Sequence, residues 1–421
     1  MTLEGLFCRL ARLRRFRLFP LGPEIEGFCE WLCNQGFSRE AVRNHLWQAS
    51  HFNQYLRRLG VRDYRGVEKS LAERFIKEHL PRCRCRSIPT SRHVGATRSV
   101  RSMMDYLSER GLLAPPIKRP SLHEELLEEY LGYLKCERDL AERTIGSHRR
   151  HLISFLDHLG PKGTAKRLCK LSPDEVQTFF TNYTQDLGRT TRRHVQGTLR
   201  GFFRFCVKQG YIDRDLTQAV PQIRTYKLSH LPRSISDQDA QKVLESIDRT
   251  TAVGRRDYAI IQLLYRYGVR GCQVRALRLQ DIQWRLSRIR FPALKGGKEV
   301  VEPLTEDVGD ALLEYLRRGR PHADYAEVFL TTCAPFHPLR SPSNVSFVVA
   351  KRMREAGVSG CPKGSHAFRH GFAVRMLKGG QSLKAIADML GHRHINTTFI
   401  YTKVDLETLK QLPLEWPEVY P

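Results

Sequence analysis

A helical pattern occurs twice in the first half of the sequence with nearly the same spacing. HFNQYLRRLG (His51–Gly60) parallels HLISFLDHLG (His151–Gly160) at an offset of 100 residues, and Arg98–Leu113 parallels Gly197–Ile212 at an offset of 99. Two matched segments in the same order favour a duplication over a chance similarity between amphipathic helices. The sequence therefore predicts two small helical bundles that share one order of helices.

Two proline-rich basic stretches divide the chain into three blocks. They are APPIKRP (Ala114–Pro120) and PQIRTYKLSHLPR (Pro221–Arg233), and a serine that begins a capping box follows each of them. We expect a helical domain at 1–118, a second one at 119–225 of which the first is a duplicate, and a third domain at 234–415.

The third block changes its pattern from helix to strand and back. Ile289–Leu294 and Val300–Pro303 flank a tight reversal that contains Gly296 and Gly297, as in a β-hairpin. Helical periodicity precedes this hairpin and resumes after it. The expected fold is mainly α, with a small antiparallel β-sheet confined to the C-terminal domain.

The charge of the chain points to a polyanionic partner. Lys and Arg total 70 against 44 Asp and Glu, which gives a formal net charge of +26. Because the basic residues occur in every third of the chain, they favour nucleic acid held by folded domains over a membrane surface. No apolar run is long enough for a membrane span. The five arginines between Arg9 and Arg17 are typical of a basic arm, a solvated helix face or an organelle transit segment.

The cysteines indicate a reducing compartment and no metal. Eleven scattered cysteines without a secretory signal read as reduced thiols of a cytoplasmic protein. The only close pairs are Cys29/Cys33 and Cys83/Cys85, and neither has the two-residue gap of a common zinc knuckle. We therefore expect neither a metal site nor any other cofactor.

Four segments of the third block carry cations, histidines and a tyrosine. They are GVRGCQVRALRLQDI (Gly268–Ile282), ALKGGKEVVEPL (Ala293–Leu304), SHAFRHGFAVRML (Ser365–Leu377) and LGHRHINTTFIYTKV (Leu390–Val404). In this order the segments resemble the motifs of the tyrosine recombinases, also called the phage integrase family. Residues 121–225 resemble, more loosely, the helical core-binding domain of that family. The resemblance implies a catalytic set of Arg270, Lys295, His366, Arg369, His392 and Tyr401.

The chemistry of these residue types agrees with the resemblance. Cleavage of a phosphodiester without a metal needs cations that stabilise the transition state, and a guanidinium donates to two oxygens at once. We expect Arg270 and Arg369 to hold the phosphate while Tyr401 attacks phosphorus and keeps the bond energy as a phosphotyrosine.

The remaining members of the set would move protons or orient the phosphate. His366 would take the tyrosine proton or orient the phosphate, His392 would donate to a phosphate oxygen, and Lys295 would protonate the leaving oxygen. The family usually has a glutamate three residues after the first arginine, and Gln273 stands there instead. A glutamine at this position still accepts a hydrogen bond but carries no charge.

The sequence thus predicts a site-specific recombinase, expected to serve a mobile element. Its partners would be duplex DNA and three further copies of itself, or related recombinases, around a Holliday junction. A type IB topoisomerase and a non-catalytic accessory relative remain as alternatives. The first block would add DNA contacts, with protein contacts in the tetramer as the alternative. The expected DNA-contact residues are Arg82, Arg84, Arg86, Arg92, Arg193 and Arg200.

Overall fold

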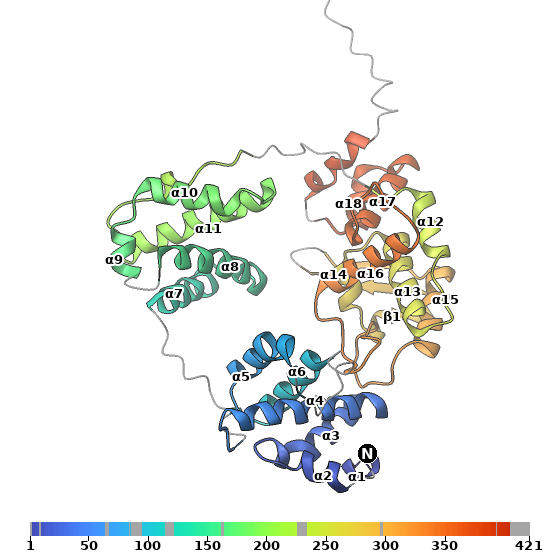
Figure 1. Cartoon of the computed structure of the whole chain (residues 1–421). Helices are drawn as coiled ribbons and strands as arrows, with labels where there is room; N and C mark the ends of the chain where they lie inside the picture. The colour runs from blue at the N-terminus through green and yellow to red at the C-terminus, as the bar shows by residue number, and fades with distance from the viewer. Residues whose placement is uncertain are drawn as a thin grey trace, which may run out of the picture. The chain divides into compact units, whose positions relative to one another are not determined.

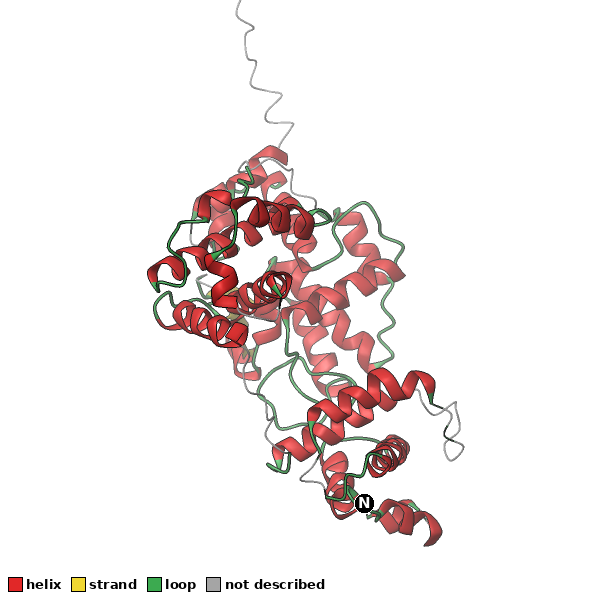
Figure 2. Ribbon diagram, turned by 60° about the vertical axis from the view of Figure 1, so that its left-hand side comes forward, coloured by secondary structure: helices red, strands yellow, loops and turns green. Residues whose placement is uncertain are grey.

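The chain folds into two compact units. A computed structural model describes residues 2–7, 10–63, 67–83, 85, 95–113, 122–160, 164–224, 234–294, 298–392 and 394–404. One unit comprises Met1–Pro115 together with His230–Pro421, and the other comprises Pro116–Ser229 (Figure 1). Helices make up most of both units (Figure 2), and no helix among the described residues is long and apolar enough to cross a membrane.

The first block is built around one long helix, α4, which packs against α3 and α6. Ser38 caps α4 by accepting a hydrogen bond from the Ala41 amide, and Leu46, Phe52 and Leu56 are buried in the core. The elements are α1 (Leu3–Leu6), α2 (Leu10–Phe16), η1 (Gly22–Glu24), α3 (Ile25–Asn34), α4 (Arg39–Arg58), α5 (Lys69–Arg74), the π-helical turn η3 (Phe75–His79), η4 (Leu80–Arg82) and α6 (Ala96–Glu109).

The second block forms the other unit and has a core of its own. Helices α7, α8 and α11 bury aromatic side chains that include Tyr130, Phe155 and Phe202. A capping box between Ser172 and Glu175 begins α10. The elements are α7 (Leu122–Cys136), α8 (Glu142–Leu159), α9 (Thr164–Cys169), α10 (Pro173–Thr184), α11 (Arg189–Lys208) and η6 (Thr217–Ala219).

The matched sequence segments fall on equivalent helices of the two blocks. His51 lies in α4 and His151 in α8, while α6 and α11 hold the second pair of segments. Each block also has a separate buried cluster. The division into three domains stays a prediction, since residues 1–115 and 230–421 belong to one compact unit.

The third block is helical around a small sheet of order β1-β2-β3, in which both pairs are antiparallel. This arrangement confirms the expected fold class. Phe291 pairs with Val300 at the end of the hairpin, and the turn with Lys295 lies outside the described residues. The strand β1, only two residues long, was not predicted.

The elements of the third block position the candidate site. They are α12 (Asp237–Glu245), α13 (Ala252–Tyr267), α14 (Gly271–Ala276), η7 (Leu279–Asp281), β1 (Ile282–Gln283), η8 (Trp284–Leu286), β2 (Arg288–Phe291), β3 (Val300–Pro303), α15 (Glu306–Arg318), α16 (Pro342–Glu355), α17 (Ser365–Lys378), α18 (Leu383–Met389), η9 (Ile395–Thr397) and η10 (Phe399–Val404).

Candidate active site

Arg270 owes its position to a sharp turn between α13 and α14. Gly268 ends α13 in the left-handed conformation, and a Cβ there would lie 2.6 Å from the Phe372 ring. Arg270 is the N-cap residue of α14. Its guanidinium Nη1 lies 3.4 Å from the carbonyl oxygen of Leu390 and 3.5 Å from that of Gly391. The turn thus directs this arginine toward the end of α18.

Gln273 is buried and binds the backbone on both sides of its amide. Its Oε1 accepts from the Arg270 amide at 3.1 Å, and its Nε2 donates to the Pro292 carbonyl at 3.3 Å. The expectation that this glutamine accepts a hydrogen bond agrees with the first contact. The side chain therefore connects the backbone of Arg270 to the chain just after β2.

Arg369 lies beside Arg270 with its guanidinium buried. Its Nη1 donates to the Gly268 carbonyl at 2.9 Å, and its Nη2 donates to the Leu390 carbonyl at 2.8 Å. Burial, and then the charge of Arg270, lower the pKa of Arg369 to about 10. Among the described residues, neither arginine forms an ion pair with a carboxylate. Two uncompensated cations at one place form a site for an anion.

Tyr401 lies in η10 and is buried against α17 and α18. It packs with Phe372, Ile386 and Leu390, and its Oη lies 2.9 Å from Nδ1 of His370. Burial raises the pKa of Tyr401, while the charges of Arg369 and Arg270 act in the opposite direction. The phenol is therefore protonated at neutral pH and close to both cations.

His370 is the neighbour of this tyrosine that the sequence analysis did not single out. Burial is the main cause that lowers the pKa of His370, followed by the charges of His366 and Arg369. A ring with a lowered pKa is neutral at pH 7, so its Nδ1 can accept from the Tyr401 hydroxyl. The only sequence signal was its place directly after Arg369.

His392 leaves α18 where the helix ends. Gly391 adopts a φ of +61°, as expected for a glycine that ends a helix, and His392 follows it. The Nδ1 of His392 lies 2.7 Å from Oγ1 of the buried Thr398. A hydroxyl that donates to Nδ1 leaves the proton of the neutral ring on Nε2. Burial, then Arg369 and Arg270, lower the pKa of His392 to about 4.

The structure brings four members of the predicted set together. They are Arg270, Arg369, His392 and Tyr401. His366 lies exposed in the first turn of α17, with its ring centroid 6.3 Å from that of His370. The sequence predicts Asn396 as the cap of the short helix before Tyr401, and this prediction is wrong: Asn396 lies inside η9, and His394 precedes this turn.

The six predicted DNA-contact arginines differ in their surroundings. Arg82 and Arg193 are exposed, and Arg200 is half-buried with its Nη2 donating to the Val220 carbonyl at 2.8 Å. The other three, Arg84, Arg86 and Arg92, lie outside the described residues. DNA contact by these side chains stays a prediction.

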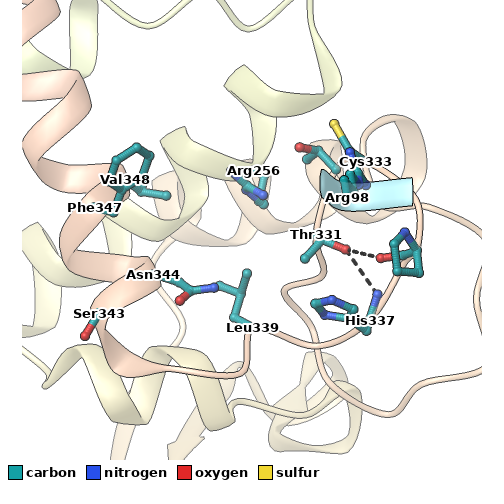
Figure 3. Close-up of a pocket in the computed structure, with 12 residues that line it drawn as sticks. Arg98, Arg256, Thr331, Cys333, His337, Leu339, Ser343, Asn344, Phe347 and Val348 are labelled. Carbon is teal, nitrogen blue, oxygen red and sulfur yellow. Dashed lines mark hydrogen bonds between the residues drawn. The ribbon is translucent and has the colours of Figure 1, made fainter. Parts of the chain in front are cut away.

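A separate open pocket of about 590 Å³ is drawn in Figure 3. Its lining includes Arg98, Arg256, Thr331 and His337, where the Thr331 hydroxyl donates to the Pro335 carbonyl and accepts from the His337 amide. None of the four catalytic candidates lines the pocket. The pocket is therefore distinct from the site formed by the arginine pair and Tyr401.

Comparisons with known proteins agree with this geometry. Residues 233–408 match the phage integrase family, and residues 127–210 match the phage integrase N-terminal SAM-like domain. The putative integrase/recombinase y4rA of Sinorhizobium fredii is 34% identical over 94% of this chain and 95% of its own length. The chain belongs to the phage integrase family, the tyrosine recombinases. Enzymes of this class cleave and rejoin DNA in site-specific recombination.

A second relative and a solved structure are each similar to part of the chain. Tyrosine recombinase XerC of Oceanobacillus iheyensis is 28% identical over 68% of this chain and 94% of its own length. A lambda integrase tetramer bound to a Holliday junction superimposes with a TM-score of 0.53 at 15% identity, covering 72% of this chain and 85% of that one. The second similarity establishes the fold alone.

Proposed function

We propose that Tyr401 is the nucleophile of a site-specific recombinase that serves a mobile element in the cytoplasm. The observation that carries this proposal is the arginine pair beside the tyrosine, since both cations lie within one site without a carboxylate partner among the described residues. A scissile phosphate placed between Arg270 and Arg369 supplies the missing negative charge. The same guanidinium groups then stabilise the additional charge of the transition state.

The reaction follows from the atoms that the site provides. Oη of Tyr401 forms a bond to phosphorus, the bond to the 5′ oxygen breaks, and the product is a 3′-phosphotyrosine. The phenolic proton passes to a neighbouring base, either His370 at 2.9 Å or His366. His392 donates from Nε2 to a phosphate oxygen, and Lys295 gives a proton to the departing 5′ oxygen.

Strand exchange completes the proposed function. The 5′ hydroxyl of a second cleaved strand attacks the phosphotyrosine, which reverses the chemistry and produces a Holliday junction. The lambda integrase that resembles this fold was solved as a tetramer on such a junction, which supports a tetramer of this chain on duplex DNA. The similarity to y4rA, a putative integrase/recombinase, supports integration or excision of a mobile element.

The test is covalent capture on a nicked duplex that carries the element's own end. Wild type should give a protein–DNA adduct that survives denaturant, and Tyr401→Phe should bind the same duplex equally but give none. An adduct in the Phe variant would move the nucleophile elsewhere. Relaxation of plasmids that lack the site would favour the topoisomerase alternative, and absence of any wild-type adduct would favour the accessory one.

A further inference from the structure

Four side chains of the first block converge on one point. They are His51, His79, Cys83 and Cys85, and their ligand atoms all lie within 4.8 Å of one another. His51 is buried in the middle of α4, His79 is the last residue of η3, and the two cysteines follow η4. Residues from separate elements thus present two imidazole nitrogens and two sulfurs to the same small volume.

Three of the six distances between these ligand atoms match the edges of a tetrahedral metal site. The Nε2 atoms of His51 and His79 are 3.2 Å apart, Cys83 Sγ is 3.4 Å from His51 Nε2, and Cys85 Sγ is 3.7 Å from His79 Nε2. Tetrahedral zinc with ordinary bond lengths places two nitrogens about 3.3 Å apart and a nitrogen and a sulfur about 3.5 Å apart. The three distances fit these edges within about 0.2 Å, the tolerance expected for a metal site.

Two hydrogen-bond donors lie beside the sulfurs, and an aromatic ring packs against both imidazoles. Arg58 Nη1 donates to Cys85 Sγ at 3.5 Å, and the Cys85 amide donates to Cys83 Sγ at 3.4 Å. Burial raises the pKa of the Cys83 thiol in the metal-free chain, so a zinc ion would displace this proton when it binds, because the thiolate is the form that binds metal. The Phe75 ring packs at 5.1 Å against each of the two imidazoles.

The second block offers an internal comparison at an offset of 100 residues. The corresponding pairs are His51 and His151, Tyr55 and Phe155, His79 and Phe179, and Cys83 and Tyr183. The ring centroids of Tyr55 and His79 are 5.1 Å apart, as are those of Phe155 and Phe179.

The histidines on the two long helices also make equivalent contacts. His51 meets Cys83, and the Nδ1 of His151 lies 3.0 Å from the Tyr183 hydroxyl. The same helical frame therefore holds aromatic rings and a hydroxyl in one block, but four ligand atoms in the other. Ordinary packing satisfies this frame without any histidine or cysteine at the positions of His79 and Cys83.

We propose that His51, His79, Cys83 and Cys85 bind one structural zinc ion. Two thiolates and two neutral imidazoles balance the charge of Zn²⁺ and are the ligand types it prefers. Because all four tetrahedral positions are filled by protein, the ion has no open position for substrate and acts by holding the chain. The zinc ion would link His79, Cys83 and Cys85 to His51 of helix α4, and so hold the exposed Arg82 near this helix.

The test is the metal content of the full-length protein and the spectrum after cobalt substitution. We expect one zinc per chain by mass spectrometry of the metal, and thiolate-to-cobalt charge-transfer and tetrahedral d–d bands once Co²⁺ replaces it. Cys83→Ser with Cys85→Ser should lose both the metal and the bands. The matched control is Cys33→Ser, a half-buried thiol of the same block, which should keep both.

A second variant covers the case in which loss of the ligands unfolds the block. His79→Phe with Cys83→Tyr introduces the aromatic residues of the second block, so it should fold without metal, and its melting temperature should not respond to a chelator. The melting temperature of wild type should fall under the same chelator. A metal-free wild type that takes up no cobalt, zinc retained in the Cys83/Cys85 variant, or a Cys83–Cys85 disulfide in unreduced protein would each overturn the proposal.

Discussion

Arg369 offers the sharpest perturbation of the proposed chemistry. In Arg369→Lys the positive charge stays, but one ammonium replaces a fork whose two nitrogens donate to the Gly268 and Leu390 carbonyls at 2.9 and 2.8 Å. A lysine cannot reach both carbonyls and a phosphate oxygen together. Loss of one preorganised donor to a developing anion costs about 3–4 kcal/mol, or about 10²–10³ in rate. An unsatisfied buried carbonyl costs about 1–3 kcal/mol of stability in addition.

The assay is single-turnover formation of the Tyr401 adduct at saturating enzyme, with DNA affinity measured separately. Affinity should change little, because the scissile phosphate is one of many that a recombinase contacts. The control is Arg375→Lys on the same helix, where the guanidinium stacks 4.0 Å from the Tyr265 ring and pairs with Asp237 at 3.3 Å. That variant should lose stability but keep the cleavage rate. Cleavage by Arg369→Lys within about threefold of wild type would refute the clamp.

Three further predictions concern a proton donor, a pH dependence and DNA binding by the first block. Lys295→Ala should cleave slowly but recover on a substrate with sulfur at the 5′ bridging position, since a thiolate leaves without a proton; no recovery would remove Lys295 as the acid. In the folded protein the pKa of His392 is lowered to about 4. As pH falls from about 6.5, the unfolded chain therefore binds a proton at this ring before the folded chain does. The melting temperature should drop between about pH 6.5 and 4. His392→Asn should weaken that drop, and an unchanged drop would contradict the burial argument. Neutralising the four arginines of segment 82–92 should make DNA affinity less dependent on salt. The slope of log affinity against log salt should fall by about 0.9 for each phosphate that the variant no longer binds, and the adduct should still form at saturating enzyme. An unchanged slope with loss of tetramers would assign this segment to protein contacts.

The periodicity of apolar residues predicted most of the helices, and the order of the motifs predicted the residues of the candidate site. The helical pattern predicted the long helices because one face of each is buried, and the two glycines predicted the hairpin of β2 and β3. The strand β1 was missed because two residues show no alternation. Arg270, Arg369, His392 and Tyr401 were predicted from a motif, and the structure adds what a motif cannot contain, namely the shared carbonyl of Leu390.

Contacts between distant residues were the part that the sequence could not supply. His370 was not singled out, because nothing in its local pattern distinguishes it from any histidine on a helix, yet its Nδ1 lies 2.9 Å from the Tyr401 hydroxyl. The four candidate zinc ligands were missed for a related reason. Cys83 and Cys85 have an unusual gap, and their partner His51 lies on a different helix, so only folding brings the imidazole to the sulfurs.

Gln273 departs from the family pattern and makes a hydrogen bond to the backbone on each side of its amide. The side chain is buried between an amide that needs an acceptor and the Pro292 carbonyl, 3.3 Å from its Nε2, that needs a donor. A glutamine satisfies both, whereas an ionised glutamate would place a carboxylate oxygen against the carbonyl. The amide therefore fixes the backbone of Arg270 without a charge. In the proposed reaction the incoming phosphate is the counter-ion of Arg270 and Arg369, because no carboxylate among the described residues neutralises the arginine pair.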